Sequence, residues 1–219
     1  MNILDIKRTT VPLLKPSDSV GFALELMLDE QLFVLPLVGE DGVYAGLLAY
    51  DQLLESSKKT LLKKIIPVHT EAYLTADNSV YDALRLYQSG VGLIVLADAD
   101  KIYRDALTAD ALLGYFAQLG GVDQPGGYIT LRIDRNNYAL SEIARIAESN
   151  NALIISLLLS SAPDADSLDL TLKFNLEDLT YLIATFERFS YEVIGYHHQS
   201  NISDMYNDRY WSLIRYLNT

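Results

Sequence analysis

The sequence predicts an α/β (α+β) protein in two parts. Residues before Gly121 contain an internal repeat with a period near 60, and residues after Gly127 alternate strand-like and helix-like segments in a different order. Between them, residues 120–127 form the strongest cluster of chain breakers in the sequence. We therefore expect this segment to link two domains.

The repeat consists of three blocks that recur in the same order. Residues 18–20 correspond to 78–80, residues 35–38 to 93–96, and residues 41–54 to 100–113. In each copy a serine, Ser19 or Ser79, is expected to cap an amphipathic helix, which precedes a buried strand, a turn, a second strand and a short helix. One such β-α-β-β-α unit is too small to close its own sheet, so we expect the two copies to pack together.

The second part predicts a different order of elements. These are a strand at 128–133, a helix at 138–149, strands at 153–159 and 168–174, a helix at 176–189 capped by Asn175, and a strand at 191–196. The order βαββαβ builds a four-stranded antiparallel sheet with two helices on one face, the ferredoxin-like arrangement. Residues 204–218 predict a further helix, whose apolar stripe needs a surface to cover.

The composition narrows the choice of partners. The 219 residues carry a net charge of -12, divided equally between the parts before and after Gly121. Such a chain repels phosphate backbones and anionic lipids, so we expect neither nucleic acid nor a membrane as a partner. The N-terminus lacks the features of a signal peptide, and no apolar run reaches about 18 residues, which predicts a cytoplasmic protein.

Residues that could support catalysis or bind a metal are few. The chain has no cysteine, which excludes thiolate chemistry, and three histidines. His197 and His198 are neighbours in a strand and point to opposite faces, so they would not chelate one ion. The aspartate pairs 98/100 and 164/166 lie in turn sequences. We expect no catalytic residue and no metal site, and hence no enzyme.

The first part resembles a tandem of cystathionine β-synthase (CBS) domains. The similarity lies in residues 15–20, 35–38, 41–42 and 46–48, and the first copy is the clearer one. The second part looks like an ACT domain, from its strand order and from 133–135 leading into 139–143. The combination is similar to the CBS-plus-ACT proteins of acetoin-utilisation type. It implies domains at 1–60, 61–121 and 127–198, followed by the C-terminal amphipathic helix at 199–219.

The CBS resemblance implies a small ligand, an adenine nucleotide or a related metabolite, in clefts between the copies. The implied contacts are Thr10, Val11, Pro36, Gln52, His69, Thr108 and Asp110. The family's signature places a hydroxyl at a helix start, for phosphate, and an acidic residue three positions later, for the ribose. The first copy has Ala49 and Gln52 there, whereas the second keeps Thr108 but has Ala111. Asp51 and Asp110 lie one residue early and could instead cap their helices.

The ACT resemblance implies amino-acid binding at the first turn between strand and helix. Here Asn136, Asn137, Tyr138 and Ala139 replace the usual Pro-Gly, and Tyr138 would crowd the cleft. Both resemblances imply a non-catalytic protein that works as a homodimer. We expect a sensor that binds its ligand in the CBS clefts. The alternatives are a ligand-free structural or adaptor dimer that binds another protein, and an amino-acid sensor that uses residues 136–139.

Overall fold

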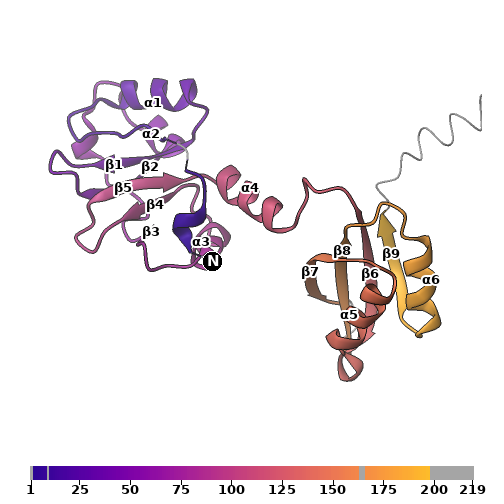
Figure 1. Cartoon of the computed structure of the whole chain (residues 1–219). Helices are drawn as coiled ribbons and strands as arrows, with labels where there is room; N and C mark the ends of the chain where they lie inside the picture. The colour runs from indigo at the N-terminus through magenta and orange to yellow at the C-terminus, as the bar shows by residue number, and fades with distance from the viewer. Residues whose placement is uncertain (1, 9, 163–165, 198–219) are drawn as a thin grey trace, which may run out of the picture. The chain divides into compact units, whose positions relative to one another are not determined.

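A computed structural model of the chain describes residues 2–8, 10–162 and 166–197. The chain is a mixed α/β protein that divides into two compact units, Met1–Phe116 (unit 1) and Ala117–Thr219 (unit 2) (Figure 1). The helix expected at 204–218 lies outside the described residues. The finer domain bounds expected from the sequence stay predictions.

Unit 1 contains the two copies of the repeat. Its elements are η1 (Ile3–Asp5), α1 (Val20–Asp29), β1 (Val34–Val38), β2 (Tyr44–Ala49), α2 (Tyr50–Leu54), η2 (Leu62–Lys64), β3 (Tyr73–Leu74), α3 (Val80–Gln88), β4 (Ile94–Ala97), β5 (Tyr103–Leu107) and α4 (Ala109–Leu119), which continues into unit 2. The predicted caps are confirmed. Ser19 Oγ accepts a hydrogen bond from the Phe22 amide at 3.2 Å. Ser79 is the N-cap residue of α3, and its amide and Oγ both donate to Asp82 Oδ2 at 2.8 Å.

Strand pairing fixes the correspondence between the copies. β1 pairs with β2 and β4 pairs with β5, both antiparallel, and each hairpin has a register shift at the same place. Leu35 lies opposite Leu48, and Ile94 lies opposite Leu107, the counterpart of Leu48. The expected match of 35–38 to 93–96 is therefore wrong by one residue, because the second copy has a single deletion, between its helix and its strand.

A local two-fold axis relates the copies. Val43 forms an isolated bridge with Ile102, its own counterpart. On either side of this bridge the Tyr44 amide donates to the Lys101 carbonyl at 2.8 Å, and the Tyr103 amide donates to the Gly42 carbonyl at 2.9 Å. Buried side chains from both copies also form one apolar cluster. The copies therefore bury each other's sheets, as the sequence predicted.

The segments that precede the two copies are exchanged. The amide of Leu62, just before the second copy, donates to the Asp18 carbonyl at 2.8 Å beside α1 of the first copy. The amide of Ile3, before the first copy, donates to the Asn78 carbonyl at 3.3 Å beside α3 of the second. Each copy is thus completed by the segment that precedes the other, which brings residues 7–8, 10–11 and 66–70 toward the candidate clefts.

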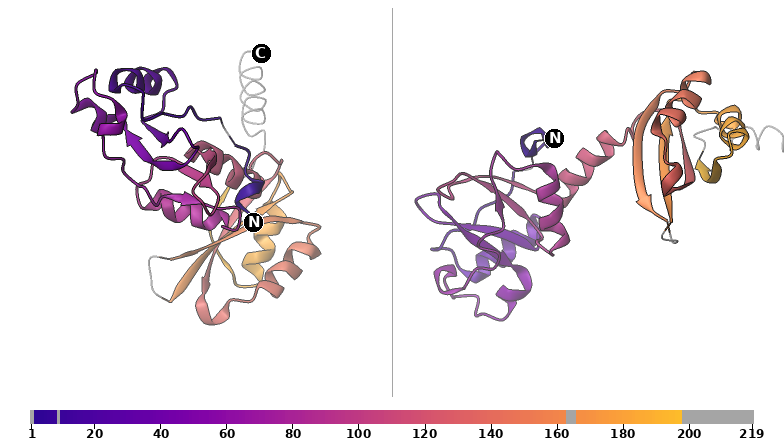
Figure 2. Two further views of the ribbon diagram at one scale, coloured as in Figure 1. Left: turned by 90° about the vertical axis from the view of Figure 1, so that its left-hand side faces the viewer. Right: turned by 90° about the horizontal axis from the view of Figure 1, so that it is seen from below.

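Unit 2 has the expected βαββαβ order. Its elements are β6 (Gly127–Asp134), η3 (Arg135–Asn137), α5 (Leu140–Ser149), β7 (Ile154–Ser161), β8 (Ser167–Phe174), α6 (Thr180–Arg188) and β9 (Glu192–His197). The sheet order β7-β8-β6-β9 is antiparallel throughout and is ferredoxin-like. Both helices cover the same face of the sheet (Figure 2), where they close a single apolar core.

Two helix starts differ from the predictions. α5 begins at Leu140, two residues late, and α6 begins at Thr180, four residues late. Asn175 is not the cap of α6, because its Oδ1 accepts a hydrogen bond from the Leu153 amide at 2.7 Å. The amide of Thr180 instead donates to Asp178 Oδ1 at 2.9 Å. Asn175 thus fixes the start of β7, a long-range role that a local pattern cannot reveal.

The glycine-rich segment 120–127 is part of unit 2. The Lys173 side chain is only 1 % exposed, and its Nζ donates to the carbonyls of Gly121 and Gln124. Ser156 Oγ donates to the Gly120 carbonyl at 3.1 Å. Because a buried ammonium needs these acceptors, the segment is held against the sheet and is not a free linker.

Candidate functional site

The candidate residues of the first copy surround the segment 66–70. Gln52, in α2, donates from its Nε2 to the Ile66 carbonyl at 2.6 Å, while its Oε1 is buried without a hydrogen-bond partner among the described residues. His69 has a left-handed backbone, with φ of +52°, and its carbonyl accepts a hydrogen bond from Tyr44 Oη at 3.0 Å. Pro36 is buried in β1, where its carbonyl accepts from the Leu14 amide.

The backbone at Gly46, three residues before Ala49, explains why the first copy needs a glycine there. Its φ is +139°, and a Cβ there would lie 2.6 Å from Pro67 Cβ and 3.0 Å from the Val68 carbonyl oxygen. The segment 66–70 crosses β2 at this point, since Leu47 and Val68 exchange both backbone hydrogen bonds at 2.8 Å. Any side chain at position 46 would push this segment away from β2.

The second copy keeps a hydroxyl at the start of its helix. Thr108 Oγ1 accepts a hydrogen bond from the Ala111 amide at 3.3 Å and so caps α4. Asp110 is exposed in the first turn, and Asp51 has the same place in α2. Ala49, the counterpart of Thr108, caps nothing. Thr108 is therefore the capping residue of α4. Among the described residues, neither Asp51 nor Asp110 forms a capping hydrogen bond at the start of its helix.

An ion pair occupies the place of the glycine in the second copy. Arg8 Nη1 lies 3.3 Å from Asp105 Oδ2, and Asp105 is the counterpart of Gly46. Thr10 is exposed on the same N-terminal segment, whereas the side chain of Val11 is 4 % exposed and packs in the core. Because the side chain of Val11 is buried in the core, a ligand could contact only the backbone of this residue. Sequence reasoning missed Arg8, because its ion pair joins residues 97 positions apart.

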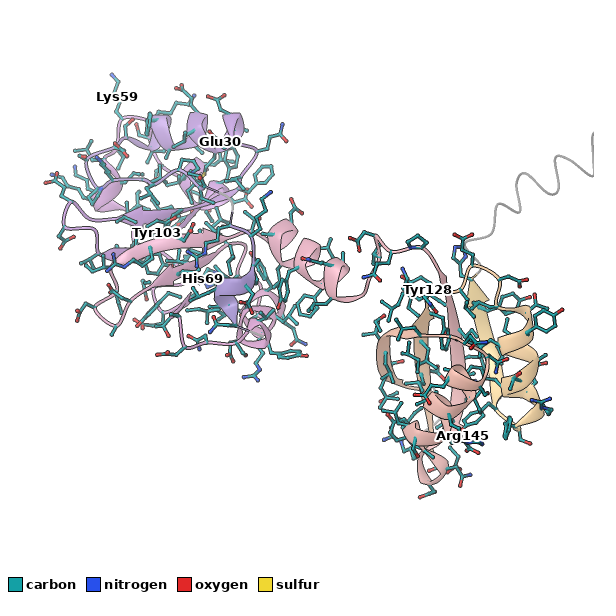
Figure 3. The ribbon with its side chains drawn as sticks, viewed as in Figure 1. Glu30, Lys59, His69, Tyr103, Tyr128 and Arg145 are labelled. Atoms are coloured by element: carbon teal, nitrogen blue, oxygen red, sulfur yellow. The ribbon has the colours of Figure 1, made fainter. Side chains whose placement is uncertain are left out.

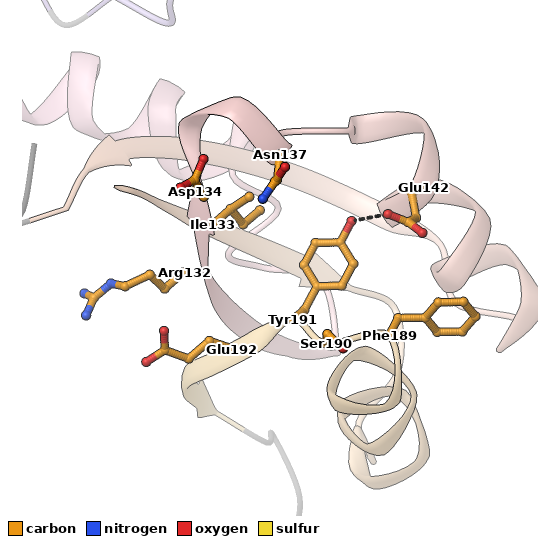
Figure 4. A pocket seen from close by; sticks show the side chains of 9 residues that line it. All are labelled: Arg132, Ile133, Asp134, Asn137, Glu142, Phe189, Ser190, Tyr191 and Glu192. Carbon is orange, nitrogen blue, oxygen red and sulfur yellow. Dashed lines mark hydrogen bonds between the residues drawn. The ribbon is translucent and has the colours of Figure 1, made fainter. Parts of the chain in front are cut away.

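A cleft in unit 2 lies where the ACT resemblance places a ligand. It has a volume of about 360 Å³ and is lined by Arg132, Ile133, Asp134, Asn137, Glu142, Phe189, Ser190, Tyr191 and Glu192 (Figure 4). Of the four residues predicted at this turn, Asn137 lines the cleft, and Asn136, Tyr138 and Ala139 do not. The turn is built without a left-handed residue, because Asp134 Oδ1 accepts from the Asn136 amide at 2.8 Å.

Charged side chains in this cleft are held by specific partners. Arg132 binds Asp169 through two hydrogen bonds of 3.0 and 3.1 Å. Tyr191 Oη donates to Glu142 Oε2 at 2.9 Å, which Figure 4 shows as the link from the start of β9 to α5. Burial, and then the hydrogen bond and charge of Glu142, raise the pKa of Tyr191 to about 12. The phenol therefore keeps its proton at neutral pH and is a stable hydrogen-bond donor.

A second cleft of about 360 Å³ lies in unit 1, away from the predicted residues. It is lined by Leu13, Lys15, Ser17, Val38, Gly39, Glu40 and Gly42, at the turn between β1 and β2. The turn is shaped by Gly42, which has φ of +83°, and by Asp41, whose Oδ1 accepts from the Val43 amide. Residues 15–20, 35–38 and 41–42 carry the resemblance described above, but the sequence did not mark them as a cleft, because the cleft joins two short segments that are separate in the chain.

Comparisons with known proteins give one family match and several similar solved structures. Residues 3–59 match the family model of the CBS domain. A CBS domain pair/ACT domain protein from Thermotoga maritima is 14% identical with a TM-score of 0.49, over 54% of this chain and 98% of that one. The acetoin utilization protein AcuB from Vibrio cholerae is 17% identical with a TM-score of 0.48, over 56% and 95%. The CBS domains of a transcriptional regulator from Streptococcus pneumoniae are 12% identical with a TM-score of 0.48, over 52% and 98%.

The family match thus covers the first copy of the repeat, together with the segment before it. The second copy repeats the same strand pairing about the Val43–Ile102 bridge. Within the residues that the structure describes, no helix is both long and apolar enough to span a membrane.

Proposed function

We propose that the chain is a non-catalytic regulatory protein whose unit 1 binds a small ligand, an adenine nucleotide or a related metabolite. The observation that carries this proposal is the match of residues 3–59 to the CBS domain, a module that typically binds regulatory ligands. The internal two-fold axis supports a pair of such modules, because it brings the copies together with equivalent hydrogen bonds.

The second copy is the better candidate for the phosphate end of a nucleotide. It combines the Thr108 hydroxyl, the start of an 11-residue helix, and the Arg8 guanidinium on the segment that borders β5. Helix starts and arginine both favour anions. In the first copy Ala49 has no hydroxyl, and Gln52 offers a neutral amide. We therefore assign the phosphate to the Thr108 end and neutral ligand groups to the Gln52 end.

Titration with AMP and with adenosine tests the proposal. Each compound, in the millimolar range, should raise the melting temperature of the protein and give a calorimetric signal. Thr108→Ala should weaken AMP binding several-fold. Ser79→Ala is the matched control, because it removes a helix-capping hydroxyl in the same copy away from the cleft, and it should leave binding unchanged. The absence of any shift or heat with both compounds would refute the nucleotide version.

The proposed signalling form is a homodimer. Apolar side chains are exposed on α1, where Phe22 is 48% and Leu28 is 55% exposed, and on the edge strand β7, where Leu158 is 67% exposed. Such surfaces favour association of helices and of sheet edges. Sedimentation analysis should give a dimer. Phe22→Ser and Leu158→Ser, tested separately, should identify which surface holds it together.

An adaptor without a ligand is the first alternative. In that case Thr108→Ala would leave the capture of a protein partner unchanged, and neither AMP nor adenosine would bind.

The cleft of unit 2 supports a second function, amino-acid sensing. Its lining carries both charges, from Arg132 and from Asp134, Glu142 and Glu192, which suits the two charged groups of a free amino acid. A thermal-shift panel of the amino acids should then show one or a few stabilising members. Glu142→Gln should reduce that shift, and Glu148→Gln, which lies on α5 outside the cleft lining, should not.

A further inference from the structure

A cluster of lysines stands out in this acidic chain. Residues 58–64 contain Lys58, Lys59, Lys63 and Lys64 and no acidic residue. These four lysines, the lysine patch, are all exposed. Figure 3 shows the Lys59 side chain pointing away from the ribbon. Seven consecutive positions thus hold four of the 17 basic residues of a protein whose net charge is -12.

The backbone that carries the lysine patch is fixed. The Gly21 amide donates to the Lys58 carbonyl at 2.9 Å, and the Lys63 amide donates to the Pro16 carbonyl at 3.0 Å. Between them, Leu62 is fully buried and holds the segment on the core. A binding partner therefore meets positive charges on a largely preorganised backbone, which lowers the entropy cost of binding.

The charges of the lysine patch have no acidic partner within residues 2–8, 10–162 and 166–197. None of the four lysines forms an ion pair among the described residues. Basic residues elsewhere in unit 1, such as Arg8 and Arg104, do form ion pairs. The carboxyl of the nearby Asp18 accepts from the Lys15 amide at 2.7 Å. The start of α1, beside Lys58, adds a positive partial charge.

Exposed apolar side chains accompany the patch. Leu61 lies within it and is 36% exposed, and Ile66 follows two residues after Lys64 and is 83% exposed. Apolar residues surrounded by charged ones are typical of protein interfaces. A partner that fits this surface therefore carries negative charge together with a few apolar groups.

We propose that the lysine patch docks a short acidic peptide segment of a partner protein. The segment 58–64 spans at most about 25 Å when extended, which suits a short peptide. Outside the patch the chain carries a net charge of -16, so a long nucleic acid or an anionic membrane would also meet repulsion. A second copy of the chain carries the same net charge of -12, so overall repulsion also opposes its docking on the patch. The four lysines are not among the residues of the candidate clefts, although Ile66 belongs to the segment that Gln52 contacts. The proposed docking does not depend on ligand binding in those clefts.

Fluorescence anisotropy at low ionic strength tests the proposal. The probe is a short fluorescein-labelled peptide of glutamate with interspersed leucine. The wild-type protein should bind it, and Lys59→Gln/Lys63→Gln should bind about fivefold more weakly, since each exposed charge pair contributes modestly. Lys7→Gln/Arg85→Gln is the matched control. It lowers the net charge by the same amount, at residues exposed elsewhere on unit 1, and should change the affinity less than twofold.

Three results would overturn the proposal. One is the absence of binding to the peptide at low salt. Another is an equal loss of affinity in the patch variant and in the control, which would mean that only the overall charge matters. The third is tighter binding of labelled oligothymidylate, or of vesicles that contain phosphatidylserine, than of the peptide, which would assign the surface to a nucleic acid or a membrane.

Discussion

The two copies of the repeat in unit 1 build the same fold but complete their candidate clefts differently. In the first copy Gly46 allows the segment 66–70 to cross directly over β2. In the second, Asp105 stands at that position and pairs with Arg8. The shared bulge and buried strands set the backbone in both copies, whereas the cleft residues are free to differ. We therefore expect substitutions at corresponding positions of the two copies to change the stability of the protein by different amounts.

The largest difference is expected at the Gly46 position. Gly46→Ala places a Cβ 2.6 Å from Pro67 Cβ at a φ of +139°, and we expect a loss of about 2–4 kcal/mol in the free energy of unfolding. Asp105→Ala removes one partly exposed ion pair and should cost less than about 1 kcal/mol. Urea unfolding of both variants measures this difference, and similar losses would contradict the assigned roles.

A second difference is expected at alkaline pH, from the equivalent residues Tyr44 and Tyr103. Burial, with a smaller effect from Asp105, raises the pKa of Tyr103 to about 12, and burial followed by the charge of Glu71 raises the pKa of Tyr44 even further. The folded protein keeps these protons where the unfolded chain loses them. The stabilisation is complete below pH ~10 and is lost as the pH rises through the folded pKa, by at most about 1.4 kcal/mol per group and pH unit.

Unfolding measured between pH 9 and 11 separates the two tyrosines. Tyr44→Phe and Tyr103→Phe should each make the loss of stability less steep. Tyr44→Phe should also destabilise the protein by about 1 kcal/mol at neutral pH, because it removes the hydrogen bond from Tyr44 Oη to the His69 carbonyl. Slopes identical to that of the wild-type protein would show that neither phenol is held neutral by the fold.

Helix capping gives a smaller, reciprocal effect. Thr108→Ala removes the cap of α4 and should cost about 1 kcal/mol, while Ala49→Ser supplies the missing cap of α2 and should gain a few tenths to about 1 kcal/mol. Thermal unfolding of the two variants measures both effects. A loss of stability in Ala49→Ser would mean that the contacts of the cleft, and not capping, select alanine at that position.

The smallest effect is expected from the Arg8–Asp105 ion pair. Its side chains are 34% and 24% exposed, so Arg8→Gln should cost about 0.2–1 kcal/mol at low salt, and less as salt is added. Repeating the unfolding measurement at two salt concentrations tests this expectation. A cost that stays the same at high salt would show that Arg8 acts mainly by packing.

Local patterns predicted most of the fold. The strands of unit 2, the repeat and the Ser19 and Ser79 caps follow from apolar periodicity and capping residues that lie close together in sequence. The errors occur where a distant contact decides. Asn175 bonds the Leu153 amide instead of capping α6, and the single deletion before β4 shows only in the strand register.

The candidate sites were less accessible to sequence reasoning. The predicted Gln52 contacts the segment 66–70, which carries the predicted His69, and Asn137 lines the cleft of unit 2. By contrast, Arg8 and Tyr191 gain their roles from Asp105 and Glu142, partners far away in the chain. A motif cannot mark such pairs, because the fold alone brings them together.

Native mass spectrometry of freshly purified protein tests the central claim, that unit 1 holds a ligand within a homodimer, most directly. The proposal predicts a mass of twice the 24.5 kDa chain together with a bound small molecule, or with AMP after its addition, and a smaller fraction of that adduct in Thr108→Ala. A bare monomer that takes up neither AMP nor adenosine would contradict it.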